Sequence, residues 1–290
     1  MRGIVLAGGT GSRLWPITKV VSKQLLPIHS KPLIYYPIST LMLAGIRDIL
    51  IITTRSDQYS FKELLGDGSR FGINLKYQVQ AHPAGLAEAF LIGEKFIDSG
   101  NVALILGDNI FHGSGLGNQL RNSALTSGAR IFGVKVKNPQ GYGILEIGSN
   151  GEIVSLEEKP IIPKSNYAIP GLYFYDSQVV DIAKHIQPSN RGELEITSVN
   201  EAYLSQNNLS YSILSRGTAW FDAGSIKSLF AASSYVKAIE EREGVMVGCL
   251  EEVAWRNGWI SINDLEISAN ELKGNIYSDY LYSLLDGSQN

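Results

Sequence analysis

The opening of the 290-residue chain constrains its fold more than any other stretch. The apolar residues 3–7 have the length of a short buried strand. They lead into a turn that is rich in glycine and hydroxyl residues and ends on a cation: Gly8, Gly9, Thr10, Gly11, Ser12 and Arg13. Glycines accept positive φ and let several backbone N–H groups converge on one anion, and the Arg13 fork of donors suits phosphate oxygens. The stretch predicts a phosphate-binding loop at the end of a strand.

Two familiar phosphate loops do not fit this turn. A Walker A loop requires a lysine directly after its last glycine, and none stands there. A dinucleotide fingerprint could begin at Gly9 and Gly11, but Leu14 occupies the place of its third glycine. A glycine-rich turn without any ligand is the alternative that the loop alone leaves open.

Composition and charge favour a globular protein that acts on small molecules. Hydrophobic residues make up 44% of the chain and the formal net charge is −3, so no general polyanion-binding surface and no nucleic acid partner are expected. No apolar run approaches the length of a membrane span. The single cysteine, Cys249, cannot form an internal disulfide, and we expect a cytoplasmic protein without a membrane partner.

The rest of the chain alternates short apolar strands with amphipathic helices. Strands are expected at 48–53, 74–80, 102–106, 129–136, 168–175, 209–214 and 219–222, with a hairpin of 141–147 and 153–158. Helices are expected at 32–45, 61–65, 86–97, 116–127, 177–185 and 194–204. This alternation predicts an α/β fold with a mostly parallel sheet between layers of helices, and the strands at 209–214 and 219–222 are expected to close that sheet. We expect a core over 1–224 that contains the hairpin as an insertion, and a helical part over 225–290.

Carboxylates follow two of the predicted strands. In open α/β sheets ligands bind beyond the carboxyl ends of the strands, so Asp108 and the glycine loop can meet there. Asp222 follows the last strand, and two carboxylates together suit Mg²⁺, although each alone could be a turn or capping residue. Glu158 and Lys159 end another strand, with Lys159 expected to be extended because Pro160 follows it. The alternative for this last pair is an ordinary exposed ion pair.

Several segments in unbroken order resemble the glucose-1-phosphate thymidylyltransferase (dTDP-glucose pyrophosphorylase) family of sugar-phosphate nucleotidyltransferases. The segments are Leu6 to Leu14, Ser22-Lys23-Gln24-Leu25-Leu26-Pro27 and Lys31 to Ile46, followed by 65–69, 107–109, 156–160, 164–168, 171–176 and 191–197. The opening alone would indicate only the wider superfamily. Residues 22–27 and the Tyr-Tyr-Pro at 35–37 narrow the resemblance to this branch.

The resemblance implies both a fold and a reaction. The fold is a Rossmann-like three-layer α/β structure of the nucleotide-diphospho-sugar transferase type, with a helical C-terminal extension. The reaction is a Mg²⁺-dependent nucleotidyl transfer from dTTP to α-D-glucose 1-phosphate that gives dTDP-glucose and pyrophosphate. This is the first step of dTDP-L-rhamnose and related deoxysugar biosynthesis, and the family also suggests a homotetramer.

The resemblance further implies a role for each matching residue. Arg13 and Lys23 are the implied catalytic residues, and Asp108 and Asp222 the implied metal ligands. The implied nucleotide-binding residues are Leu6, Gly8, Gly9, Thr10, Gly11, Gln24, Gln80 and Gly85. The implied sugar-phosphate-binding residues are Asn109, Gly143, Glu158, Lys159 and Tyr173.

Some positions depart from the family pattern, and other functions are open. Ala84 and Glu88 replace an aspartate and a glutamine of the pattern, Ala223 replaces a threonine, and the match fades over 110–118. Feedback by dTDP-rhamnose is therefore not predicted. One alternative is the same reaction with UTP or another sugar 1-phosphate, because a thymine methyl allows only about 1–3 kcal/mol of discrimination. Another is a catalytically silent nucleotide-sugar sensor or regulatory subunit. The joint presence of the implied catalytic and metal-binding residues argues against this alternative.

Overall fold

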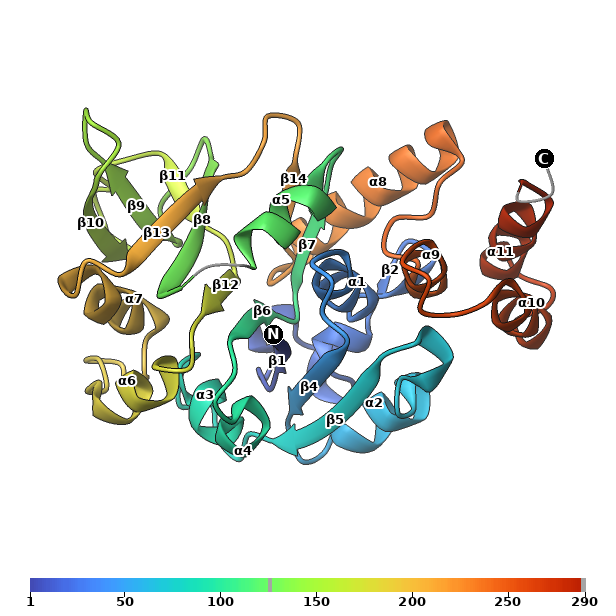
Figure 1. The fold of residues 1–290 in the computed structure, drawn as a ribbon, viewed down its shortest axis with the longest axis horizontal. Coiled ribbons are helices and arrows are strands. Elements are labelled where there is room, and N and C mark those ends of the chain that lie inside the picture. Colours follow the sequence, from blue (N-terminus) through green and yellow to red (C-terminus); the bar gives the residue numbers. More distant parts are fainter. Residues whose placement is uncertain (125–126, 288–290) are drawn as a thin grey trace.

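A computed structural model describes residues 1–124 and 127–287 of the chain. Its main element is a 10-stranded sheet with the order β10-β9-β11-β8-β12-β6-β1-β4-β5, in which β13 also pairs with β8 (Figure 1). One half of this sheet is parallel and consists of β1 (Arg2–Ala7), β4 (Asp48–Thr53), β5 (Asn74–Val79) and β6 (Val102–Leu106). These strands begin and end within one residue of their predicted bounds. The strands β1, β4 and β6 are nearly continuous apolar runs, and β5, at the edge of the sheet, alternates polar and apolar residues.

Helices cover both faces of the parallel half. Val5 of β1 packs into a core with α1 (Tyr35–Leu43) and α2 (Gln58–Leu65). Its neighbours Ile4 and Leu6 belong to a second core with α3 (Glu88–Ile92) and α4 (Glu94–Ile97). Because successive side chains of a strand point to opposite faces, the sheet separates the two cores. The predicted three-layer α/β arrangement is confirmed.

The other half of the sheet is largely antiparallel. Its strands are β8 (Ala129–Lys135), β9 (Gly143–Ile147), β10 (Ile153–Glu158), β11 (Tyr167–Ile169), β12 (Leu172–Tyr175) and β13 (Leu209–Ile213). The predicted hairpin is confirmed as β9 and β10. The single strand predicted at 168–175 is wrong, since Pro170 and Gly171 divide it into β11 and β12. Proline has no N–H for a ladder, which explains the break. The helices α6 (Val179–His185) and α7 (Ile196–Ser205) pack in the same layer as α3.

The strand β14 (Ala219–Asp222) corrects another prediction. It does not close the main sheet but pairs antiparallel with β7 (Asn109–His112) in a separate two-stranded sheet. The register sets Asp222 opposite Asn109, and the N–H of Ala223 donates to the carbonyl of Asp108 at 2.9 Å. A pairing that the sequence did not predict therefore brings the two candidate metal ligands together.

The helix bounds differ from the predictions mainly at Pro and Gly. The segment predicted as a helix over 32–45 begins instead with β3 (Lys31–Pro32), which pairs with β2 (Pro27–Ile28) ahead of α1. The helix predicted over 86–97 is two short helices that meet at Gly93. The helix α5 (Leu116–Ser123) confirms most of the one predicted over 116–127, of which residues 125–126 lie outside the described residues.

Four helices follow β14: α8 (Ile226–Glu243), α9 (Leu250–Arg256), α10 (Ile262–Glu271) and α11 (Ile276–Gly287). Figure 1 shows α10 and α11 at the end of the molecule opposite the β9–β10 hairpin. The helix α8 is joined to the β2–β3 segment by a buried ion pair of 2.7 Å between Glu240 and Lys31. The division of the chain after residue 224 stays a prediction. Among the described residues, none of the helices is both long and apolar enough to span a bilayer.

A capping box holds the start of α8, three residues after Asp222. The N–H of Ser228 donates to Oγ of Ser225 at 3.2 Å, and the N–H of Ser225 donates to Oγ of Ser228 at 3.0 Å. We expect Ser225→Ala to lower the free energy of unfolding by about 1 kcal/mol, because a helix N–H loses its acceptor. Urea denaturation measures this change. Ser261→Ala removes the equivalent cap of α10 and should cost a similar amount, whereas no loss in either variant would contradict the assignment.

Candidate active site

A cavity of about 360 Å³ lies at the carboxyl ends of the parallel strands, a volume typical of small-molecule sites. Leu6 near the end of β1, Gln80 after β5 and Asp108 after β6 all line it. These three strands belong to the parallel run β6-β1-β4-β5, so their carboxyl ends share one edge of the sheet. The prediction that the glycine loop and Asp108 meet at this edge is supported by the shared cavity.

Most of the predicted site residues line this cavity: Leu6, Gly9, Arg13, Lys23, Gln24, Gln80, Gly85, Asp108, Asn109, Gly143, Glu158, Lys159, Tyr173 and Asp222. The exceptions are Gly8, Thr10 and Gly11. A Cβ on Gly8 would lie 2.5 Å from Oε1 of Gln80, so a side chain here would displace the Gln80 amide. Only Gly11 of the three loop glycines has the expected positive φ, 63°, and it begins the 3-10 turn that carries Arg13.

Other lining residues were not predicted as site residues, among them Tyr142, Glu195, Thr197, Asn200 and Trp220. The indole N–H of Trp220 donates to Oδ1 of Asn109 at 2.6 Å. The centroids of the Trp220 and Tyr142 rings are 5.0 Å apart. Trp220 stands two residues before Asp222, and Glu195 and Thr197 fall in the matching segment 191–197. Their positions in the sequence could therefore have indicated them.

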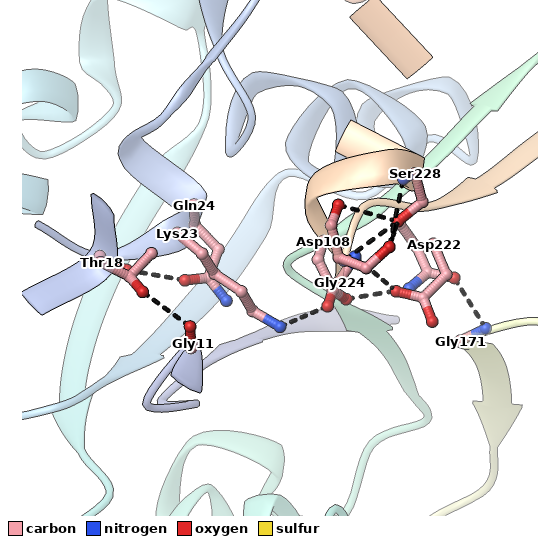
Figure 2. A network of polar contacts seen from close by, with 12 residues as sticks. Gly11, Thr18, Lys23, Gln24, Asp108, Gly171, Asp222, Gly224 and Ser228 are labelled. Carbon is pink, nitrogen blue, oxygen red and sulfur yellow. Dashed lines mark hydrogen bonds and ion pairs between the residues drawn. The ribbon is translucent and has the colours of Figure 1, made fainter. Parts of the chain in front are cut away.

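An acidic pair and a lysine form the centre of the cavity. Nζ of Lys23 makes an ion pair with Oδ2 of Asp108, and Figure 2 shows the lysine extending from the glycine-loop side toward this carboxylate. Burial alone would raise the pKa of Asp108, but the charge and hydrogen bond of Lys23 hold that pKa below its ordinary value. Burial, and next the charge of Asp108, raise the pKa of Asp222. The two carboxylates therefore repel each other inside the cavity.

The donor set fits Mg²⁺. Carboxylate oxygens are hard ligands, and Mg²⁺ is usually held by one or two carboxylates together with water and substrate phosphate oxygens. In the part of the chain that the structure describes, no third His, Cys, Asp or Glu joins Asp108 and Asp222 in a metal-binding group. A divalent cation between them would relieve the repulsion that raises the pKa of Asp222.

Arg13 lies on the Asp222 side of the cavity. A Cβ on Gly224 would lie 2.8 Å from Nη2 of Arg13, and the arginine charge acts to lower the pKa of Asp222. Among the described residues, no carboxylate lies within ion-pair distance of this guanidinium. Its donors are therefore available to an anionic ligand in the cavity.

A second charged group lies at the antiparallel end of the cavity. Glu158, at the end of β10, is 3.2 Å from Nζ of Lys159 and accepts a 2.5 Å hydrogen bond from Oγ1 of Thr197. Gly143 is the register partner of Glu158 in the hairpin. The pKa of Tyr173 is raised by burial and then by the charge of Glu158, so the phenol stays protonated as a donor.

The expectation that Lys159 is extended is wrong. Its φ is 47°, in the left-handed region that a side chain other than glycine rarely adopts. The N–H of Lys159 donates to the carbonyl of Tyr142 at 3.1 Å, which holds this backbone in place. Strain of this kind is found mostly where a side chain must be presented in a particular direction, and here that side chain lines the cavity.

The third part of the cavity is formed by Gln80 and Gly85. Gln80 is 5% exposed, and its Nε2 donates to Oε2 of Glu88 at 2.7 Å. Gly85 has a φ of 111°, and a Cβ there would lie 2.4 Å from the backbone of Leu194. Only glycine fits this position, because a side chain would meet that backbone and the φ is one that other residues rarely adopt.

The glycine loop and Asp108 follow parallel strands, and the pairing of β14 with β7 brings Asp222 to the same cavity. A glycine-rich loop, cations and a pair of carboxylates together suit a nucleoside phosphate with its divalent cation. The model of the family described as nucleotidyl transferase matches residues 2–238. This chain therefore belongs to the nucleotidyl transferase family. The predicted class of enzyme is confirmed.

Individual proteins that resemble this chain indicate its similarity more specifically than the family model does. A glucose-1-phosphate thymidylyltransferase from Mycolicibacterium smegmatis is 56% identical over 286 residues, which cover 99% of this chain and 99% of the relative. The crystal structure of a Bacillus anthracis protein described as a glucose-1-phosphate thymidylyltransferase, in complex with sucrose, matches with a TM-score of 0.75. It is 41% identical and the match covers 81% of this chain and 94% of that one. A UDP-glucose pyrophosphorylase complexed with UDP-glucose matches with a TM-score of 0.72, 26% identity and coverage of 82% and 98%. The predicted resemblance and fold class are confirmed.

Proposed function

We propose that this protein transfers the thymidylyl group of dTTP to α-D-glucose 1-phosphate and releases pyrophosphate. The observation that carries the proposal is that one cavity joins the glycine loop, the Asp108–Asp222 pair and the Glu158–Lys159 pair. The high identity with named thymidylyltransferases over the whole chain supports the choice of substrates. The reaction forms a bond from a phosphate oxygen of glucose 1-phosphate to the α-phosphorus of dTTP. The bond from that phosphorus to the bridging oxygen breaks, and its electrons leave with pyrophosphate.

We assign the nucleotide to the parallel half of the cavity. Leu6, Gly8, Gly9, Thr10, Gly11 and Gln24 would surround it, and Gln80 and Gly85 would contact its base. Arg13 and Lys23 would neutralise the phosphates and the departing pyrophosphate. Because both reactants are anions, positioning and neutralisation of charge matter more here than proton transfer. Mg²⁺ bound by Asp108 and Asp222 would supply further positive charge to the phosphate oxygens.

We assign the sugar phosphate to the antiparallel end. Lys159 provides the cation for its phosphate, and Glu158 is a suitable acceptor for sugar hydroxyls. Asn109, Gly143 and Tyr173 would complete this half. A homotetramer, a cytoplasmic location and a place at the start of dTDP-L-rhamnose or a related deoxysugar pathway are proposals that rest on the family resemblance.

A second candidate is the same reaction with UTP, which the similarity to a UDP-glucose pyrophosphorylase favours. Uracil differs from thymine by the absence of one methyl group, and UTP also carries a ribose 2′-hydroxyl that dTTP lacks. A pocket distinguishes such an increment by about 10–200-fold, so the two nucleotides are expected to differ in rate rather than in kind.

The test is pyrophosphate release from the purified protein with Mg²⁺, glucose 1-phosphate and either dTTP or UTP. Mannose 1-phosphate and galactose 1-phosphate serve as controls for the sugar. We expect the highest kcat/KM with dTTP and glucose 1-phosphate. A folded protein that binds dTDP-glucose but releases no pyrophosphate with any pair would instead be a nucleotide-sugar sensor.

A further inference from the structure

The orientation of one side-chain amide in the cavity decides which bases fit beside it. Gln80 follows β5, where its N–H donates to the carbonyl of Thr53 at 2.9 Å, and its side chain lines the cavity. An amide presents a donor at Nε2 and an acceptor at Oε1. Whichever end faces the ligand determines whether the base must accept or donate a hydrogen bond.

Glu88, the first residue of α3, settles that orientation. Its Oε2 lies 2.7 Å from Nε2 of Gln80, and the carbonyl of Gly85 lies 3.4 Å from the same nitrogen. An ionised carboxylate and a backbone carbonyl can only accept hydrogen bonds. The amide nitrogen must therefore point toward them, and a bond to a carboxylate is roughly twice as strong as one between neutral groups.

The amide oxygen of Gln80 is left on the other side. Oε1 lies so close to Gly8 that a Cβ on this glycine would be 2.5 Å away. Among the residues that the structure describes, no donor is directed at Oε1. The chain therefore presents a hydrogen-bond acceptor, fixed in direction, between the glycine loop and Gly85.

We propose that Glu88 is a positioning residue that fixes the Gln80 amide with its oxygen toward the nucleotide base, so that the site selects pyrimidines with an N3–H donor. This inference rests on the proposed function. Base-reading sites commonly use the Watson–Crick edge, on which thymine and uracil carry N3–H. Cytosine has an unprotonated N3, whose lone pair would face Oε1 and leave both acceptors unpaired.

The carboxylate at position 88 is what fixes the orientation of the Gln80 amide. A neutral glutamine at position 88 can either donate or accept, so it would permit both orientations of the Gln80 amide. The carboxylate permits only one. Since thymine and uracil share the same edge, Glu88 separates them from cytosine but not from each other.

The experiment compares dTTP with dCTP in wild type, Glu88→Gln and Glu88→Met. Dissociation constants are measured by calorimetry, and kcat/KM by pyrophosphate release with glucose 1-phosphate. We expect wild type to prefer dTTP strongly and Glu88→Gln to reduce that preference by about tenfold or more, because the amide can rotate to donate to N3 of cytosine. Glu88→Met keeps a similar length without a carboxylate and should reduce the preference in the same direction. The kcat with dTTP should change far less than its KM.

Glu94→Gln is the matched control. It removes the same charge from the adjacent helix α4, where Glu94 pairs with Lys184 at the surface. Its preference for dTTP should equal that of wild type. An unchanged preference in both Glu88 variants, or an equal loss of dTTP and dCTP binding, would overturn the inference and leave the proposed function intact. If wild type turns over no nucleotide, the proposed function fails, and the binding constants still decide the role of Glu88.

Discussion

Replacing Arg13 with alanine is expected to lower kcat by about 10²–10³-fold, the usual loss when one preorganised charge-stabilising donor is removed. The KM for dTTP should rise less, because charge builds up on the departing pyrophosphate as the bond breaks. Steady-state pyrophosphate release at saturating Mg²⁺ measures both quantities.

The physical reason lies in the surroundings of the guanidinium. Arg13 is carried by a 3-10 turn that begins at Gly11, and it reaches the Asp222 side of the cavity. No carboxylate among the described residues lies within ion-pair distance of the guanidinium, and Asp222 interacts with its charge only from further away. A cation held in place without a direct ion pair needs little rearrangement to meet a phosphate anion.

Two variants separate a specific role from a general effect of charge. Arg13→Lys keeps the charge but loses the planar fork, so we expect it to recover only part of the rate. Lys19→Ala removes one positive charge from the next 3-10 turn, where Lys19 lies over the ring of Trp15 and outside the cavity. This control should keep nearly full activity. Equal losses in Arg13→Ala and Lys19→Ala would remove Arg13 from the mechanism.

The sequence predicts most accurately where local patterns decide the structure. The strands β1, β4 and β6 are continuous apolar runs, and their bounds and the residues at their ends follow directly from that pattern. The pairing of β14 with β7 could not be predicted this way, because it depends on which of several strand edges is left open in the folded sheet. The break at Pro170 is a local signal that was available in the sequence.

The site shows the same division between local and tertiary information. The glycine loop and Asp108 are recognised from their places after strands, whereas the contacts of Thr197 with Glu158 and of Trp220 with Asn109 join segments far apart in the chain. Lys159 has a positive φ although the following proline favours an extended backbone. Its N–H donates a hydrogen bond to the carbonyl of Tyr142, the residue just before β9, and this contact holds the backbone in place. Tertiary contacts here override a local preference.

Asp222→Asn is expected to have opposite effects on stability and on turnover. Burial and the charge of Asp108 raise the pKa of Asp222 in the folded protein. A carboxyl whose pKa is raised by folding binds its proton more tightly in the folded state, so its ionised form costs stability at neutral pH. Without Mg²⁺ the variant should therefore melt at a higher temperature than wild type. Asparagine can keep the acceptor for the N–H of Gly224, which Asp222 now binds at 2.9 Å.

With Mg²⁺ and dTTP the order should reverse. Wild type gains stability from ligands that bind only the folded state, and the variant should lose most of that gain together with about 10²–10³-fold in kcat. Asp108→Asn is the contrasting variant, because it leaves Lys23 without its partner and should lower the melting temperature without Mg²⁺. Both variants should need more Mg²⁺ for half-maximal rate. If Asp222→Asn melts below wild type in EDTA and keeps its response to Mg²⁺, the carboxylate is a structural residue and not a metal ligand. If the melting temperature without Mg²⁺ rises in Asp222→Asn and falls in Asp108→Asn, Lys23 neutralises Asp108 only. The carboxylate of Asp222 is then free to bind a cation from solution.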